Sequence, residues 1–110
     1  MDCLFCRIIA GEIPSNKVYE DDAVFAFRDI NPQAPTHVLI VPRKHMANVL
    51  ECDGETAARV VAAVREVAAL EKVDASGFRL LTNCGKHGCQ SVGHLHFHLL
   101  GGKQLSERMD

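Results

Sequence analysis

Residues 93–102 read Gly93-His94-Leu95-His96-Phe97-His98-Leu99-Leu100-Gly101-Gly102. Side chains two residues apart in a β-strand point to the same side of the sheet, so this alternation predicts a strand over residues 94–100. The three imidazoles would share one face of that strand and line a surface or a cleft. Leu95, Phe97 and Leu99 would share the other face and be buried.

The spacing of the histidines limits what they bind together. At a rise of about 3.3 Å per residue, His94 and His98 would lie about 13 Å apart along the strand. That distance is too long for all three histidines to bind one metal ion unless the strand bends. Two interpretations stay open at this point: a metal site built on two neighbouring histidines, and a half-exposed strand whose histidines have no role.

Composition describes an ordinary globular chain. The 110 residues are 47% hydrophobic and 24% charged, with a net charge of −2, and we expect one domain over residues 1–110. Acids outnumber scattered Lys and Arg residues, which argues against a nucleic-acid groove. We expect neither a secretion signal nor a membrane span. The five cysteines are odd in number and fit a reducing cytoplasm better than a disulfide framework.

Periodicity and turn residues predict an antiparallel α+β domain with a five-stranded sheet, one long helix and a short N-terminal helix, with the helices on one face. A cap at Asp53 would start the long helix, which continues to about Lys72. The other expected elements are a helix over residues 4–10 and strands over residues 18–20, 23–28, 37–41, 78–82 and 94–100.

Three further blocks accompany the histidine row. They are Gly88-Cys89-Gln90-Ser91-Val92, residues 29–37 with Pro42-Arg43-Lys44-His45, and residues 5–22. Together with the row they resemble the histidine triad family of nucleotide-binding hydrolases and transferases, whose phosphate loop is usually Gly-Gly-Gln-Ser-Val. The resemblance covers nearly the whole chain and is closest to the small nucleoside phosphoramidase branch. It implies the same α+β fold, with sheets joined across a homodimer.

The resemblance implies a purine nucleoside phosphoramidase with His96 as its nucleophile. A neutral imidazole is nucleophilic near pH 7, and its attack on phosphorus gives a covalent nucleotidyl-histidine that water later opens. In the family, a backbone carbonyl of the same strand holds the other ring nitrogen. His98 and His37 would help as protonated imidazoles near the phosphate. The transferase branch carries Gln at the position of His98, which favours hydrolysis here.

Two alternatives accompany this interpretation. One is a dinucleoside polyphosphate hydrolase of the same fold. The other is a nucleotide-binding interaction protein whose catalysis is incidental. Sequence does not name the physiological substrate, but a purine nucleotide or nucleoside phosphoramidate, such as adenylyl-lysine, is the ligand class that the resemblance implies.

The nucleotide site is implied in two parts. Backbone N–H groups and side chains of the loop before the row would bind the phosphate, and a hydrophobic slot would enclose the purine. The implied phosphate residues are Asn83, Cys89, Gln90 and Ser91, the slot residues are Phe5, Ile8, Phe27 and Ile30, and Asp29 would accept from the ribose. Two positions depart from the family pattern. Cys89 replaces a glycine, which is costly if the backbone there has a positive φ, and Gly93 replaces an aromatic residue.

A structural zinc ion and a dimer complete the expectations. The family places zinc on a Cys-x-x-Cys pair and two histidines, positions that are filled here by Cys3, Cys6, His45 and His94. Thiolates and imidazoles are the ligands zinc prefers, and four of them close the site. The alternative is a pair of free thiols, as we expect for Cys52, Cys84 and Cys89. The dimer would be held by residues 54–72 and 78–82, and the tail, residues 105–110, lacks the Trp-Pro-Pro ending of animal relatives.

Overall fold

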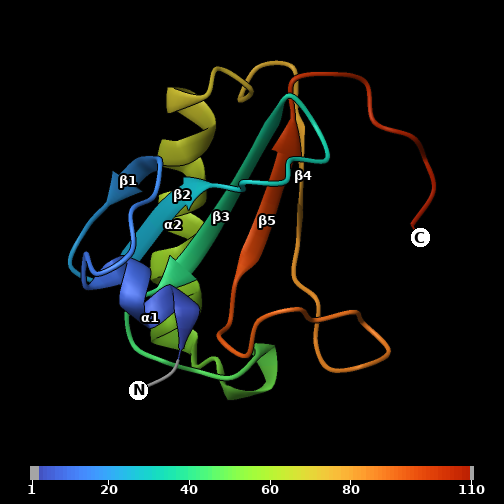
Figure 1. Ribbon diagram of the computed structural model, residues 1–110. Coiled ribbons are helices and arrows are strands. Elements are labelled where there is room, and N and C mark those ends of the chain that lie inside the picture. The colour runs from blue at the N-terminus through green and yellow to red at the C-terminus, as the bar shows by residue number, and fades with distance from the viewer. Residues whose placement is uncertain (1–2, 110) are drawn as a thin grey trace.

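The computed structural model describes residues 3–109, so the expected domain limits at residues 1 and 110 lie outside the described residues. A five-stranded antiparallel sheet with the order β1-β2-β3-β5-β4 forms its centre (Figure 1). The elements are α1 (Leu4–Ile9), β1 (Lys17–Glu20), β2 (Val24–Arg28), β3 (Thr36–Pro42), the 3-10 helix η1 (Val49–Glu51), α2 (Gly54–Leu70), β4 (Phe78–Leu81) and β5 (Phe97–Gly101). The predicted α+β class, with its long helix and short N-terminal helix, is confirmed.

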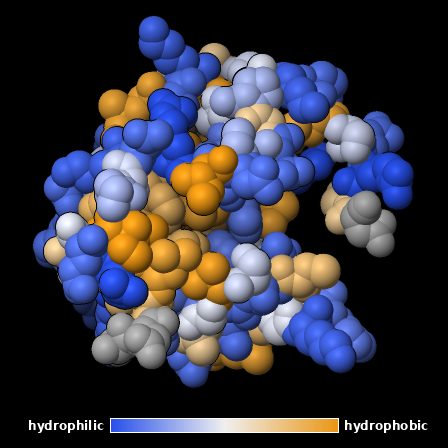
Figure 2. All heavy atoms as spheres, viewed as in Figure 1, coloured by the Kyte–Doolittle hydropathy of each residue, from blue (hydrophilic) through white to orange (hydrophobic). Residues whose placement is uncertain are grey.

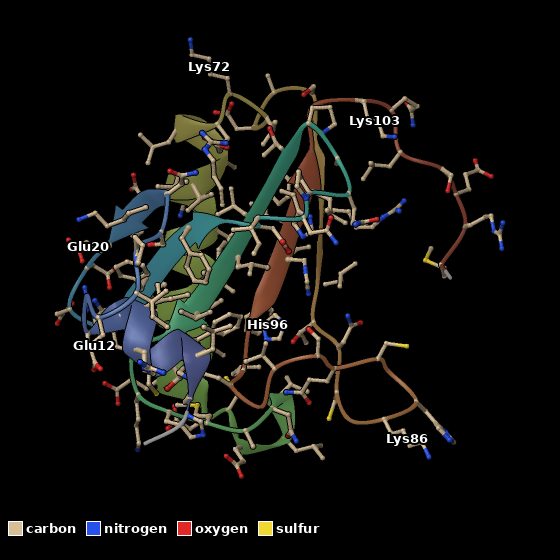
Figure 3. The ribbon with its side chains drawn as sticks, in the orientation of Figure 1. Glu12, Glu20, Lys72, Lys86, His96 and Lys103 are labelled. Atoms are coloured by element: carbon tan, nitrogen blue, oxygen red, sulfur yellow. The ribbon has the colours of Figure 1, made fainter. Side chains whose placement is uncertain are left out.

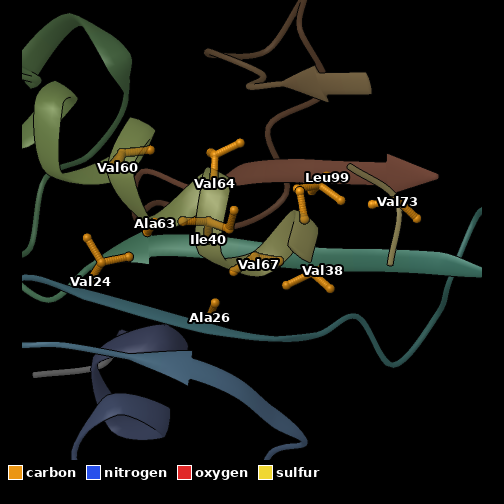
Figure 4. Close-up of a cluster of buried hydrophobic side chains, with 11 residues drawn as sticks. Val24, Ala26, Val38, Ile40, Val60, Ala63, Val64, Val67, Val73 and Leu99 are labelled. Atoms are coloured by element: carbon orange, nitrogen blue, oxygen red, sulfur yellow. The ribbon is translucent and has the colours of Figure 1, made fainter. Parts of the chain in front are cut away.

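Both faces of the sheet are covered, each by a different helix. On one face, Val38 and Ile40 of β3 pack with Val64 and Val67 of α2 in the larger buried cluster (Figure 4). On the other face, Leu39 and Val41 of β3 pack with Phe5 and Ile8 of α1. The expectation that both helices share one face was therefore wrong. The central strand is buried along its whole length, and that requires a cover on each side.

Local polar side chains fix the ends of the elements. The Asp53 carboxylate accepts a hydrogen bond from the Thr56 N–H at 2.7 Å and caps α2, as the sequence predicted. In the first hairpin, the Asp21 carboxylate accepts from the N–H groups of Ala23 and Val24, both at 2.8 Å. These bonds replace the backbone ladder at the turn and let β1 and β2 pair in antiparallel register.

The histidine row is only partly a strand. β5 starts at Phe97, which pairs with Ile40, and not at His94 as the alternation predicted. Before that point the backbone bonds elsewhere: the Leu95 N–H donates to the Met46 carbonyl at 2.7 Å. The loop after β3 thus takes the hydrogen bond that a neighbouring strand would otherwise have made, and this choice is not encoded in the periodicity.

Within residues 3–109, no helix combines the length and the apolar composition that a membrane crossing requires. The longest helix, α2, instead carries exposed polar residues between the positions that face the sheet. Its C-terminal end is tied to the sheet, because Arg28 at the end of β2 donates two hydrogen bonds to the Glu71 carboxylate, at 2.6 and 2.7 Å. This pair fixes the end of β2 directly before Asp29.

Candidate active site

A cavity of about 270 Å³ lies between α1, the end of β2 and the start of β5. Its lining is apolar apart from Asp29, Ser91, His96 and His98, and Asp29, His98 and His96 lie next to one another. Hydrophobic side chains gather over α1 in Figure 2, and His96 lies beside the start of β5 in Figure 3. A slot with one apolar and one polar end suits a ligand with the same division. The lining residues are Leu4, Phe5, Ile8, Ile13, Pro14, Phe27, Asp29, Ile30, Leu39, Ser91, Val92, His96 and His98.

His96 is buried, and its orientation is fixed by its own backbone. Its Nδ1 lies 2.7 Å from the His94 carbonyl oxygen, an atom that only accepts, so Nδ1 carries the proton. The lone pair is then on Nε2. Among the described residues no buried side-chain nitrogen lacks a partner, and none of their hydrogen bonds engages this Nε2, so it is open to the cavity. The Phe5 ring packs edge-on at 5.1 Å between ring centroids and holds the imidazole from the α1 side.

His37 and His98 form a pair next to His96. His37 Nε2 lies 2.9 Å from His98 Nδ1 and 3.4 Å from an oxygen of Asp29. Burial lowers the pKa of His37, and burial with the nearby His96 and His37 lowers the pKa of His98 to about 4. Both imidazoles are thus neutral near pH 7, whereas the sequence led us to expect protonated ones. The loss of hydration on burial destabilises an imidazolium here by more than its attraction to the Asp29 carboxylate stabilises it.

The loop before the row is held in shape by its own contacts. A Cβ atom on Gly88 would lie 2.7 Å from the Cys84 carbonyl oxygen, so only glycine fits there. Cys89 has a φ of 59°, the positive value that a glycine adopts at no cost. The Gln90 side chain bonds the Ala47 carbonyl at 2.6 Å and braces the loop against the segment after β3. Ser91 lines the cavity.

A second cluster brings together four side chains that are distant in sequence. The Sγ atoms of Cys3 and Cys6 and the Nδ1 atoms of His45 and His94 all lie within 4.8 Å of one another. His94 Nδ1 lies 3.3 Å from Cys3 Sγ, 3.6 Å from Cys6 Sγ and 3.2 Å from His45 Nδ1, and Cys6 Sγ lies 3.5 Å from His45 Nδ1. The predicted proximity of these residues is confirmed.

The geometry of this cluster fits a tetrahedral ion. Zinc bonds of about 2.3 Å to sulfur and about 2.05 Å to nitrogen give ligand separations of about 3.6 Å for N to S and about 3.3 Å for N to N. The observed separations match these values. His94 is also in the right tautomer: its Nε2 lies 2.9 Å from the Pro42 carbonyl, which only accepts, so its Nδ1 lone pair points at the cluster.

Comparison with known proteins identifies the family of this chain. The family model of the HIT domain matches residues 10–105. The chain belongs to the histidine triad, or HIT, family. It is 44% identical over 107 residues to the purine nucleoside phosphoramidase of Escherichia coli strain K12, covering 94% of this chain and 90% of that protein. It is 46% identical over 108 residues to a 14 kDa zinc-binding protein of Zea mays, covering 94% and 84% of the two chains.

Solved structures give the same assignment. A HIT family hydrolase from Clostridium thermocellum superimposes with a TM-score of 0.94 at 44% identity, covering 98% of this chain and 96% of that one. This protein is accordingly a HIT family hydrolase. The three histidines of the row lie in two different surroundings. His94 faces the cysteines, while His96 and His98 line the cavity.

The structure brings many of the residues predicted for this HIT site to one cavity, together with several that were not predicted. Phe5, Ile8, Phe27, Asp29, Ile30 and Ser91 line the cavity, whereas His37, Asn83, Cys89 and Gln90 are outside its lining. The missed residues are Leu4, Ile13, Pro14, Leu39 and Val92. Leu39 had a usable signal, because it alternates with His37 and so shares its face of β3. The others lie in loops or at a helix end, where the sequence has no periodic pattern that predicts which way a side chain points.

Cys89→Gly is expected to raise the free energy of unfolding by about 1 kcal/mol, because glycine adopts the positive φ without Cβ strain. Urea unfolding at equilibrium measures the change. Cys84→Gly is the matched control: Cys84 has no positive φ, so the same replacement only adds backbone entropy to the unfolded chain and should destabilise. Equal effects of the two variants would contradict the strain at Cys89.

Proposed function

We propose that this HIT domain hydrolyses the P–N bond of purine nucleoside 5′-phosphoramidates in the cytoplasm. The observation that carries the proposal is the His96 imidazole, whose Nδ1–H is held by the His94 carbonyl while Nε2 is open to the cavity. That arrangement presents a neutral nitrogen nucleophile of fixed direction. The similarity to the Escherichia coli purine nucleoside phosphoramidase supports the substrate class.

Two displacements at phosphorus make up the proposed reaction. His96 Nε2 attacks the phosphorus, the P–N bond to the amine breaks, and the amine departs after taking up a proton from solvent. The product on the enzyme is a nucleotidyl-histidine. A water molecule then attacks the same phosphorus, the bond to Nε2 breaks, and the water releases its proton. The nucleoside monophosphate leaves, and His96 regains its neutral imidazole.

The cavity walls support a nucleoside as the ligand. Phe5, Ile8 and Phe27 form an apolar slot for a purine, and Ile30, which also lines the cavity, is 99% exposed. Burying such a side chain against a base would contribute to binding. Asp29 lies at the polar end, where a carboxylate accepts hydrogen bonds from two vicinal ribose hydroxyls. Backbone N–H groups of the loop over residues 83–91 would bind the phosphate oxygens.

The substrate class is tested by comparing kcat/KM for adenosine 5′-phosphoramidate and for a diadenosine polyphosphate. We expect the phosphoramidate to be favoured by at least about 100-fold, because a neutral amine leaves more easily than a charged nucleotide and needs less room. A preference for the dinucleotide would assign the chain to the polyphosphate hydrolases. Nucleotide binding without turnover of either compound would favour the interaction protein.

We also propose that Cys3, Cys6, His45 and His94 hold a structural zinc ion. The matching separations and the His94 tautomer support it, as does the similarity to the zinc-binding protein of Zea mays. Four protein ligands leave no position for a substrate, so the ion would supply cross-linking and no water activation. It would link the N-terminal end of α1 to His94, which lies two residues before His96.

A homodimer is the proposed assembly. Ala62 and Ala69 of α2 and Phe78 of β4 line a groove of about 550 Å³ together with the charged residues Arg65, Glu66 and Asp74. Phe78 and Leu80 are each 37% exposed at an edge of the sheet. Sheet edges and apolar surface of this kind favour a partner. A second copy would continue the sheet at β4 and place its own helix against α2.

Light scattering at micromolar concentration is expected to give twice the mass of one chain. Ala69→Arg is expected to give the single-chain mass, because its long side chain would occupy the space in which the second copy packs against α2. Ala57→Arg is the control, because Ala57 is an exposed alanine of the same helix outside the groove. A monomeric wild-type protein, or a dimer that tolerates Ala69→Arg, would contradict this assembly.

A further inference from the structure

Within residues 3–109, two clusters have side chains that suit a metal ion, and the hydrogen-bond partners of their histidines differ. One is the cluster of Cys3, Cys6, His45 and His94 described above. In the other, Asp29, His37 and His98 bring one carboxylate and two imidazole nitrogens within 4.8 Å of one another. Such a set binds divalent metals in other proteins. Each imidazole, however, ligates only through a nitrogen that carries no proton, so the partner of its other nitrogen decides what the cluster does.

The partner of His37 Nδ1 is a hydrogen-bond donor. The Gln33 main-chain N–H donates to His37 Nδ1 at 3.0 Å, and an amide N–H has no lone pair to offer in return. His37 Nδ1 therefore holds the lone pair, and its Nε2 carries the proton in the neutral ring. This is the reverse of His94, whose outer nitrogen faces the Pro42 carbonyl. His37 Nε2 is thus a hydrogen-bond donor and a poor metal ligand.

This assignment passes directly to the next histidine. His37 Nε2 lies 2.9 Å from His98 Nδ1, so the proton on His37 requires an acceptor lone pair on His98 Nδ1. The proton of the neutral His98 ring is then on Nε2, the opposite edge. None of the hydrogen bonds among the described residues engages that edge, and His98 lines the cavity with its ring 5.1 Å from that of His96. Burial lowers the pKa of both rings and keeps the pair neutral.

We propose that His37 is a positioning residue that holds His98 as a neutral Nε2–H donor toward the reacting phosphorus, and that the Gln33 main-chain N–H sets this direction. The chain of donors runs one way, from Gln33 to His37 to His98. His98 then gives a hydrogen bond to the oxygen or nitrogen on which negative charge develops, and it carries no positive charge itself. The catalytic part of this proposal rests on the function proposed above.

Nitrogen-15 NMR of the histidine side chains at pH 7, without substrate, tests the direction independently of any activity. The expected result is an Nε2–H tautomer for both His37 and His98. An Nδ1–H tautomer or a doubly protonated ring at His98 would overturn the proposal. A zinc titration gives a second test, since zinc bound by Asp29, His37 and His98 would also overturn it. If the tautomers are as expected but no phosphoramidate is cleaved, the substrate class is wrong and the positioning stands.

Both Gln33→Pro and Gln33→Ala remove the side-chain amide, but only Gln33→Pro also removes the main-chain N–H. In Gln33→Pro we expect a mixture of His98 tautomers and a fall in kcat of about tenfold or more, with KM changed less than about threefold. Gln33→Ala should keep the wild-type tautomers and activity. Unchanged tautomers and kcat in a folded Gln33→Pro would contradict the proposed control by Gln33.

A second pair of variants tests His37 without altering the loop. His37→Phe keeps a buried ring but has no N–H for His98, so the His98 tautomer should become mixed and kcat should fall by about 100-fold. His37→Gln offers a side-chain N–H and should recover part of both. A His98 ring that stays in the Nε2–H form in His37→Phe, or His37→Gln no better than His37→Phe, would refute the positioning role.

Discussion

Replacing His96 with alanine is expected to lower kcat by about 10⁴-fold or more, with the Kd for a purine nucleoside monophosphate changed by less than about tenfold. Among the described residues that line the cavity, only His96 has a backbone acceptor on Nδ1 and a free Nε2, so we expect no neighbouring group to replace it as the proposed nucleophile. The apolar slot and the loop amides are untouched by the substitution. Ground-state affinity and turnover should therefore separate.

Single-turnover kinetics and calorimetric titration of the monophosphate measure the two quantities. His87→Ala is the control, since His87 is exposed on the loop and does not line the cavity. Its kcat should stay within about twofold of the wild type. The assignment fails if His96→Ala keeps more than a few per cent of wild-type kcat, or if a nucleotidyl adduct is trapped on a different histidine.

Loss of the proposed zinc ion is expected to have the largest effect on stability. Metal binding to four preformed ligands adds directly to the free energy of folding, and removal also leaves two thiols and two imidazole nitrogens crowded together. We expect Cys3→Ser to lower the unfolding free energy by about 3 kcal/mol and the Tm by about 10 °C or more. Activity should fall with it, because His94 supplies the carbonyl that orients His96.

Elemental analysis of protein purified without chelator should give about one zinc per chain, and thermal unfolding with and without chelator gives the shift in Tm. Cys52→Ser is the matched control: Cys52 is partly exposed and lies outside the cluster, so its replacement should leave both zinc content and Tm unchanged. Less than about a tenth of an equivalent of zinc, or equal Tm values for Cys3→Ser and the wild type, would exclude the site.

Local patterns in the sequence determined most of the helices and strands. The period of α2 and its Asp53 cap, the alternation in β2, the short apolar run of β3 and the polar turn at Asp21 each depend on residues that are close in the sequence. Interactions of that range are the same in any tertiary context that buries the apolar side, so sequence alone predicted them. The common face of the three histidines was predicted for the same reason, and His94 and His96 both contact Phe5 there.

What only the tertiary structure decided are the hydrogen-bond partners of the histidines. The Pro42 carbonyl sets the tautomer of His94, and the Gln33 N–H sets that of His37. The directions of these two backbone groups depend on how the loops enter and leave β3. Leu95 bonds to Met46 in the same way, and this delays the start of β5 to Phe97. An imidazole is a metal ligand, a nucleophile or a donor according to which nitrogen holds its proton. That proton is placed by backbone groups that the fold brings into contact, and residue identity and spacing do not specify it.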